Sequence, residues 1–392
     1  MIYIIRMNIG VVGAGPVGLF FAKKMVETSG VDVNITLFEY RKYKRRQVLL
    51  LQPHVFEELE DLQSELLKYG CYVHPPAKDK DAKCYKSPLS NGHFSIRTDK
   101  LEQILRADIE GLSNIDFVNE KVTDIDMLAE YDFDILISAS GGRDPLPEAI
   151  GNVYQSDYLS HAIIFNFKVN SPDSYYQTST VSDKVKKYLA QHRFRGFRTT
   201  ADSYYIGIQL GKSEADEITG TSDTDEIKFK DLPKRIKGAF NDALKKYEMT
   251  DDVRRKTIEV SVFPIYKRRA TVYADYLASL DAEVYLIGDS LSTTHFFSGQ
   301  GVNVGCESAL TAIDAILDTN GIEYYNDHAE EYILKLKDSS EQVTVDMDKL
   351  NKMCKEYTRE EIYDIARENN LIPEGLTKRN VCLSLLHIDK FK

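Results

Sequence analysis

One short segment near the amino terminus constrains the fold more than any other part of the chain. Gly13-Ala-Gly15-Pro-Val-Gly18 follows an aliphatic run at 8–12 and opens an apolar pattern with helical spacing. In such a strand–turn–helix the first glycine permits the tight turn, the second lets backbone approach a pyrophosphate, and the third lets helix and strand pack closely. The amino terminus of the helix then faces the phosphate charge.

A second strand and an acid complete this unit. Residues 33–39 (VNITLFE) predict a strand that ends at Glu39, 21 residues after Gly18. A carboxylate at that place accepts hydrogen bonds from ribose hydroxyls in Rossmann-type units. Gly-rich turns occur in many folds, so it is the combination of strand, helix and acid that predicts dinucleotide binding. Further buried strands are predicted at 133–138 and 284–287.

A second motif lies far along the chain, directly after the strand predicted at 284–287. Gly288-Asp289 is followed by Ser298-Gly-Gln-Gly301-Val-Asn303-Val-Gly305 and by another helical pattern. A carboxylate at a strand end can bind a ribityl hydroxyl, and glycines let the next helix direct its positive end at a flavin. The alternative interpretation is a structural turn before a core helix.

Together the two motifs resemble those of the para-hydroxybenzoate hydroxylase-like flavoprotein monooxygenases, over roughly residues 7–335. The resemblance implies that the first glycines and Glu39 bind the ADP part of FAD, and that Asp289 binds the ribityl part. Arg46 resembles the family's arginine near the FAD phosphates, and Arg97 resembles the first residue of its Arg-x-x-x-Leu helix start.

Three segments, 48–53, 95–105 and 288–291, resemble the flavoprotein domain of the MICAL enzymes in particular. MICAL's calponin-homology and LIM domains have no counterpart in this chain, so actin as a substrate is not implied. The expected cofactor contacts come from both motifs and the two arginines: Gly13, Ala14, Gly15, Pro16, Val17, Gly18, Glu39, Arg46, Arg97, Asp289, Gly299, Gly301, Val302 and Asn303. No catalytic side chain is assigned, and the absence of HxxxH or HExxH spacing predicts no metal site.

Two positions depart from that family's pattern. Where the family has an Asp-Gly pair after its middle strand, this chain has Ala-Ser140-Gly-Gly-Arg-Asp144, with Ser140 at the position of the acid. Serine can form hydrogen bonds but brings no charge, which weakens the expectation of direct NADPH reduction more than that of FAD binding. Phe296 stands where the family commonly has proline, and the motif places His295 near the flavin.

The predicted fold class is α/β, with a Rossmann-type FAD-binding domain interleaved with an α+β substrate domain. The first comprises 7–160 and 270–335, and the second comprises 161–269. Within the second, alternating residues at 162–169 and 204–210 predict strands of a mainly antiparallel sheet. A polar loop at 211–225 and an amphipathic helix at 232–247 are expected to follow.

The last segment, 341–392, is predicted to be a separate helical module. Thr358-Arg-Glu-Glu361 is a capping box that predicts a helix start, and Thr377 is expected to cap another helix that reaches about residue 386. The arrangement resembles small SAP-type helix-loop-helix modules, although its nearly balanced charge argues against DNA binding. The alternatives are a helical tail that packs on the main body or one that links to a protein partner.

Three basic clusters allow two interpretations each. Residues 41–46 carry five positive charges and suit either phosphate contacts, chiefly through Arg46 and Arg41, or a solvated loop. Residues 267–269 (KRR) predict a surface turn, with the mouth of a pocket as the alternative. Residues 192–198 (HRFRGFR) suit a strand edge or contacts with an acidic or aromatic substrate.

Composition limits the class of protein. The 392 residues are 43% hydrophobic with a net charge of −11, which disfavours a general role in binding nucleic acid or anionic membranes but allows a local basic patch. Five scattered cysteines form no CxxC pair, and no apolar run approaches the roughly 18 residues that a membrane span needs. A reducing compartment with free thiols, and hence a cytoplasmic location, is the expectation.

The resemblance implies an FAD-dependent monooxygenase that takes electrons from NADPH or NADH and inserts one oxygen atom into a small-molecule or peptide substrate. Three alternatives stay open: a two-component enzyme supplied with reduced FAD by a partner reductase, a flavin oxidase or dehydrogenase, and a non-enzymatic protein that keeps the nucleotide fold. The substrate, the reductant and the oligomeric state do not follow from the sequence.

Overall fold

The computed structural model describes residues 6–28, 32–41, 45, 47–73, 93–170, 194–198, 203–219, 227–246, 249–294, 298–317, 321–343, 347–369, 371 and 378–386. The chain divides into two compact units. Unit 1 comprises Met1–Cys71, Ser90–Asp157 and Tyr266–Glu341, and unit 2 comprises Tyr72–Leu89, Tyr158–Ile265 and Gln342–Lys392. The assignment of a cofactor role and a substrate role to the predicted domains stays a prediction.

Unit 1 is built on a six-stranded sheet in the order β12-β13-β7-β1-β2-β6. Its strands are β1 (Arg6–Val12), β2 (Asp32–Phe38), β6 (Ile115–Val118), β7 (Ile135–Ser138), β12 (Ala274–Leu277) and β13 (Ala282–Leu286). The pairs β1–β2, β1–β7, β2–β6 and β7–β13 are parallel, whereas β12 runs antiparallel to β13. The strand order reverses at β1, so a ligand is expected beyond the carboxyl ends of β1 and β7. This arrangement confirms the predicted α/β fold class.

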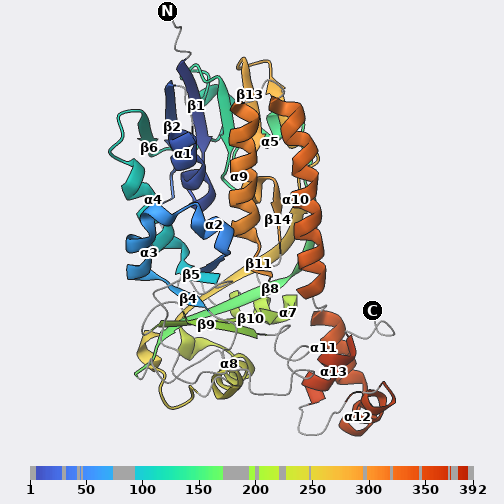
Figure 1. The fold of residues 1–392 in the computed structure, drawn as a ribbon. Helices are drawn as coiled ribbons and strands as arrows, with labels where there is room; N and C mark the ends of the chain where they lie inside the picture. Colours follow the sequence, from blue (N-terminus) through green and yellow to red (C-terminus); the bar gives the residue numbers. More distant parts are fainter. Residues whose placement is uncertain are drawn as a thin grey trace, which may run out of the picture. The chain divides into compact units, whose positions relative to one another are not determined.

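Helices cover the sheet of unit 1 because each strand has apolar residues on both faces (Figure 1). Helix α1 (Pro16–Thr28) begins with proline and buries Leu19, Phe20 and Phe21. It packs against α4 (Thr98–Ile109) and α9 (Gly301–Leu317). Helix α10 (Gly321–Val343) is tied to β13 by the hydroxyl of Tyr325, which donates to the carbonyl oxygen of Leu286 at 2.5 Å.

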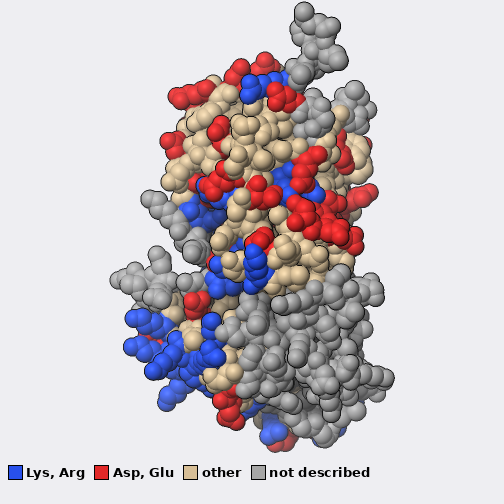
Figure 2. Space-filling view, turned by 60° about the vertical axis from the view of Figure 1, so that its left-hand side comes forward, with Lys and Arg blue, Asp and Glu red and all other residues tan. Residues whose placement is uncertain are grey.

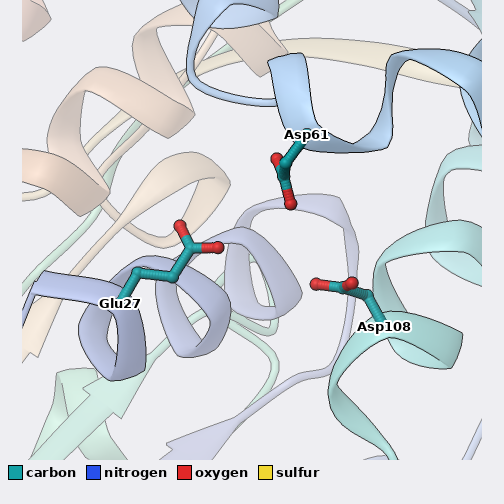
Figure 3. Close-up of side chains that lie close together, drawn as sticks. All are labelled: Glu27, Asp61 and Asp108. Carbon is teal, nitrogen blue, oxygen red and sulfur yellow. The ribbon is translucent and has the colours of Figure 1, made fainter.

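A buried lysine joins three of these segments. Lys23 on α1 is 3% exposed, and its Nζ donates to Glu27 at 2.5 Å, Asp61 at 2.6 Å and Asp108 at 2.8 Å. Figure 3 shows the three carboxylates pointing toward one another. Burial alone lowers the pKa of a lysine, but the three hydrogen bonds outweigh it and raise the pKa of Lys23 above its ordinary value. Its ammonium group therefore takes the place that a metal cation would need among these acids.

Unit 2 contains most of a second, largely antiparallel sheet in the order β14-β11-β8-β10-β9. Its strands are β8 (Gln155–Lys168), β9 (Phe194–Arg198), β10 (Ser203–Leu210), β11 (Glu259–Arg269) and β14 (Ser292–Thr293). Helix α8 (Lys234–Lys246) buries Ile236 and Phe240 against the apolar face of this sheet, where Phe165 lies. The predicted strands and amphipathic helix are confirmed, and β9 lies at the sheet edge as expected for 194–198.

Two sequence-based expectations are wrong. The stretch predicted as a polar loop contains helix α7 (Lys212–Thr219), because Ala215 and Ile218 bury one apolar face and the carboxylate of Glu214 accepts a hydrogen bond from Gly211 N at 3.0 Å. Residues 267–269 do not form a surface turn but continue β11 to its end at Arg269.

Charge is distributed unevenly. Residues 227–246 and 249–257 carry ten Lys/Arg against four Asp/Glu, although the whole chain has a net charge of −11. Figure 2 shows Lys and Arg side chains gathered at the lower left of the view. The local basic surface that the overall composition allowed is therefore present.

The carboxyl-terminal segment forms three helices, α11 (Met347–Glu356), α12 (Arg359–Glu368) and α13 (Lys378–Leu386). The capping box is confirmed: Thr358 Oγ1 accepts from Glu361 N, and the Glu361 carboxylate accepts from Thr358 N at 2.6 Å. Ile362, Ala366, Cys382 and other apolar residues make a small core of their own. Thr377 lies outside the described residues.

The remaining elements are short. They are β3 (Val48–Leu51), β4 (Cys71–Val73), β5 (His93–Arg97), α2 (Pro53–Glu57), α3 (Gln63–Tyr69), α5 (Leu146–Ala149), η1 (Glu60–Leu62), η2 (Ile125–Met127), η4 (Phe229–Asp231), η5 (Arg255–Thr257) and η6 (Gly288–Ser290). Strands β3, β5 and β4 form a three-stranded sheet in that order. Within the described ranges, no helix combines the length and apolar character that crossing a membrane requires.

The packing of α1 on β1 generates a stability prediction. A Cβ at position 18 would lie 2.0 Å from the carbonyl oxygen of Gly13, whereas nothing lies within 4 Å of one at Gly111. Gly18→Ala should therefore lower the free energy of unfolding by about 3 kcal/mol or more, even though alanine favours helices. Gly111→Ala should change it by less than about 0.5 kcal/mol. Urea unfolding followed by circular dichroism compares them, and equal stabilities would contradict the close contact.

Candidate functional site

The glycine-rich turn between β1 and α1 leaves no room for side chains. Gly13 has φ +113° and its Cβ would lie 2.7 Å from the backbone of Ala139, which follows β7. A Cβ on Gly15 would lie 2.6 Å from Nη2 of Arg45. The turn therefore packs directly against the loop after β7, and the guanidinium of Arg45 lies over its middle glycine.

Two positive groups converge at this turn. One is the amino terminus of α1, where Pro16, Val17 and Gly18 form the first turn, and the other is Arg45. Arg45 is held by Glu102 of α4, whose Oε1 accepts from Nη2 at 2.5 Å and from Nε at 3.1 Å. A guanidinium beside a positive helix end creates a place where a ligand with two negative phosphates would bind both groups.

Glu39 lies just beyond the end of β2, as the sequence predicts. Its carboxylate accepts hydrogen bonds from the backbone N of Arg41 and from Arg41 Nη2, both at 2.9 Å. Arg41 Nη2 also donates to Glu102 at 3.1 Å, so this arginine links the two acids. A carboxylate has about four acceptor positions, so Glu39 retains capacity for the two hydroxyls of a ribose.

One described arginine of the basic cluster at 41–46 reaches the glycine turn, and the role expected of Arg46 stays a prediction. Arg46 lies outside the described residues, whereas its neighbour Arg45 contacts the glycine turn. The signal was the basic cluster at 41–46, but its five charges do not reveal which side chain turns inward. Arg97 precedes α4 and makes a bidentate pair with Asp99 at 2.9 and 3.0 Å. Asp99 N donates to Arg45 O at 2.9 Å, so the start of α4 adjoins the Arg45 segment.

Asp289 lies in η6, directly after β13, and its neighbours come from another loop. Gly288 has φ +58° and packs against Val17 of α1. A Cβ on Gly141, in the loop after β7, would lie 3.5 Å from the Cβ of Asp289. The turns that follow β1, β7 and β13 therefore meet at the carboxyl edge of the sheet.

The Asp289 carboxylate combines exposure with desolvation. Its side chain is exposed, yet surrounding protein raises its pKa, while Arg45, Arg268 and Arg143 oppose that rise electrostatically. Within the described part of the chain, no hydrogen-bond donor reaches this carboxylate. Asp289 is therefore an acceptor available to a ligand, and three arginine side chains lie near enough to oppose the rise of its pKa.

The segment before α9 is held from both sides. Gly299 has φ +66°, and Gly301 and Val302 begin the helix. Asn303 is completely buried: its Oδ1 accepts from Gln52 N at 2.8 Å, and its Nδ2 donates to the carbonyl oxygens of Leu50 and Gly299, both at 2.9 Å. The Asn303 side chain thus anchors α9 to β3, and any contact of this residue with a cofactor would come from its backbone.

The loop after β7 carries a carboxylate at an unexpected position. The hydroxyls of Ser138 and Ser140 both donate to Oδ2 of Asp144, the first at 2.8 Å, and Leu146 N donates to its Oδ1 at 3.1 Å. Burial raises the pKa of Asp144, and these hydrogen bonds oppose the rise. The loop therefore has a carboxylate four residues after Ser140, and that carboxylate is held within the loop.

Sequence reasoning assigned no site role to Tyr154 or Ser290, and for the triplet that contains Arg268 it favoured a surface turn over the mouth of a pocket. Arg268 Nη2 donates to the carbonyl oxygens of Gly141 and Asp289, so the basic triplet at 267–269 reaches the site from the end of β11. The Nε of Arg268 is buried and has no partner in the described structure. His295 and Phe296, which the motif placed near the flavin, lie outside the described residues.

Comparisons with known proteins identify the fold. No family model matches the chain, and no curated protein matches its sequence. Among solved structures, PqsL, a probable FAD-dependent monooxygenase from Pseudomonas aeruginosa, matches with a TM-score of 0.58 and 14% identity over 85% of this chain and 94% of that one. The 2-methyl-3-hydroxypyridine-5-carboxylic acid oxygenase matches with a TM-score of 0.59 and 13% identity over 86% and 90%.

The flavin-dependent halogenase CmlS matches with a TM-score of 0.56 and 16% identity over 84% of this chain and 62% of that one. At these identities the likeness concerns the fold, and the narrower resemblance to MICAL stays a prediction. The chain has the fold of FAD-dependent monooxygenases.

Proposed function

We propose that this protein is an FAD-dependent monooxygenase. The observation that carries the proposal is the meeting of three turns at the carboxyl edge of one parallel sheet. The first is a glycine turn beneath Arg45, the second is the loop after β7, and the third carries Asp289, near which the charges of three arginines act. This edge, where the strand order reverses, is where doubly wound folds bind dinucleotides.

The residues present fit FAD. The diphosphate would lie at the glycine turn, between the amino terminus of α1 and Arg45. Glu39 would accept the hydroxyls of the adenosine ribose, and Asp289 those of the ribityl chain. The absence of a side chain at Gly15 would allow the close backbone approach that a diphosphate requires.

Bound FAD would supply the redox chemistry, namely uptake of a hydride, reaction with O₂ and transfer of one oxygen atom to the substrate, with the other oxygen atom released as water. The side chains of this chain bind and orient. Glu102 holds Arg45 toward the glycine turn, and Asn303 fixes the start of α9, whose positive end stabilises negative charge on a reduced ring. No acid–base residue is assigned, because orientation and exclusion of water are what this chemistry requires of the protein.

The division of labour along the chain is part of the proposal. Unit 1 contains every residue of the candidate site named above, which supports its role as the cofactor-binding part. The sheet of unit 2 would select a small-molecule or peptide substrate. The helices at 347–386 have a small core of their own, and they would dock a protein partner.

The source of electrons is the finer question. NADPH or NADH is the reductant that the sequence resemblance implies. One observation favours the two-component alternative: Asp144 is occupied by Ser138, Ser140 and Leu146, so it is not available to order a nicotinamide. The fold also supports other chemistry, since a flavin-dependent halogenase shares it. A flavin oxidase or dehydrogenase is therefore kept as an alternative.

The first prediction concerns FAD itself. Purified protein should carry flavin absorbance or acquire it on titration with FAD. Gly15→Leu should abolish binding because its side chain fills the diphosphate position. The mutant should stay folded, since the nearest atom is the mobile end of Arg45. Gly111→Leu, at a position with open space, is the matched control and should bind like wild type. A wild type that ignores added FAD would overturn the proposed function.

The second prediction concerns Asp289. Asp289→Ala should weaken FAD binding by about 1.5–3 kcal/mol, the usual scale for a lost hydrogen bond to a charged group. Surrounding protein raises the pKa of Asp289, so its carboxylate becomes protonated at a higher pH than an ordinary aspartate does. As the pH is lowered, the affinity of the wild type for FAD should therefore begin to fall at a higher pH. Asp289→Asn should lack that pH dependence. Fluorescence titrations across pH measure both effects, and identical curves for wild type and Asp289→Asn would contradict this role.

The third prediction concerns reduction. Ser140→Asp would place a second carboxylate against Asp144, so it should lower stability and leave NADPH reduction of the flavin unimproved. Ser140→Ala is the uncharged control. Anaerobic stopped-flow with NADH, NADPH and externally reduced FAD distinguishes the reductants, with a panel of phenols, indoles and methionine peptides as stimulants. Faster NADPH reduction in Ser140→Asp would show that the missing acid at position 140 limits the wild type.

A further inference from the structure

A set of hydrogen bonds centred on Ser290 joins two of the three turns at the site. Ser290 is completely buried, and its Oγ accepts hydrogen bonds from Gly141 N and Gly142 N, each at 3.0 Å. Both glycines have positive φ angles, +76° and +67°, which let consecutive N–H groups point to one acceptor. The loop after β7 is thereby closed onto a side chain of η6.

Two further side chains strengthen the same junction. Arg268 Nη2 donates to Gly141 O at 2.5 Å and to Asp289 O at 2.9 Å, so one nitrogen bridges both loops. The hydroxyl of Tyr154 donates to Ser290 O at 2.7 Å. The guanidinium of Arg268 also lies 4.4 Å from the centre of the Tyr154 ring.

These contacts fix the backbone at the carbonyl of Asp289 and at the residue that follows it. The carbonyl of Asp289 is held by Arg268, and the next residue is held through both its hydroxyl and its carbonyl. The Asp289 carboxylate itself accepts no hydrogen bond within the described part of the chain. A fixed backbone that presents an accessible carboxylate without a hydrogen-bond partner in the described part of the chain is the arrangement expected of a preorganised ligand contact.

We propose that Ser290 is a positioning residue which, with Arg268 and Tyr154, sets the place of the Asp289 carboxylate for flavin binding. The inference rests on the proposed function and adds a role for three residues that the sequence motifs did not single out. Removal of the Ser290 hydroxyl leaves two partly buried N–H groups without their acceptor, so the two loops shift and Asp289 moves with them.

The test is a double-mutant cycle on the FAD dissociation constant, measured by fluorescence titration. Ser290→Ala should weaken FAD binding about tenfold, the scale of one to two lost hydrogen bonds. If Ser290 acts through Asp289, the Ser290→Ala/Asp289→Ala double mutant should bind FAD as weakly as Asp289→Ala alone. If Ser290 had a purely structural role, the losses of FAD affinity in the two single mutants would add in the double mutant. Such additivity would overturn the proposal.

Further variants cover the case in which Ser290→Ala does not fold. Tyr154→Phe removes one hydrogen bond and keeps the ring beneath Arg268, so it should weaken FAD binding about threefold, and only when Asp289 is present. Ser95→Ala is the matched control, because Ser95 is buried in the same unit without a hydrogen-bond partner in the described structure, and it should bind FAD normally. If the wild type binds FAD and both Ser290→Ala and Tyr154→Phe bind it with the same affinity, only this inference is overturned. If the wild type does not bind FAD, the proposed function is overturned as well.

Discussion

The close contact between β1 and α1 is the constraint on which the rest of the site depends. It exists because positions 13 and 18 have no side chains: a Cβ on Gly18 would lie 2.0 Å from Gly13 O. Val17 extends the contact, since Gly288 and Gly305 both pack against it. The contact at Gly18 joins α1 to the turn after β1, and the contacts at Gly288 and Gly305 join α1 to η6 and to α9. The amino terminus of α1 is thereby placed beside the ends of β1 and β7. Without that packing the charged side chains of the three turns would not lie close to one another.

Electrostatics then determines what the site attracts. The chain carries a net charge of −11, yet Arg45, Arg143 and Arg268 all act on the one carboxylate of Asp289. Glu102 holds Arg45 in place, and two carbonyl oxygens hold Arg268. Positive charge from side chains and from the helix end is therefore oriented before a ligand arrives, which reduces the ordering that binding requires. A dinucleotide with a diphosphate and vicinal hydroxyls matches this distribution of donors and acceptors.

The shared fold leaves the reaction open. Solved structures that have it include monooxygenases and a halogenase, so the architecture by itself does not specify the chemistry. The loop after β7 departs from the pattern of the family that the sequence resembles. Its carboxylate comes from Asp144 and is satisfied by two serines, and its glycines are bound to Ser290. Because its polar groups are bound within the protein, the loop has a structural role. This favours the alternative in which a partner supplies reduced flavin.

The sequence by itself determined the elements whose signals are local. Glycine spacing and helical periodicity predicted β1 and α1, and the capping box predicted the start of α12, because the groups that interact there are neighbours in the chain. Only the tertiary structure decided which charges reach the site. Arg268 meets Gly141 across 127 positions, and the choice of Arg45 depends on which way one side chain in a basic run turns against Glu102. Such contacts are set by the packing of distant segments, and that packing leaves no periodic trace in the sequence.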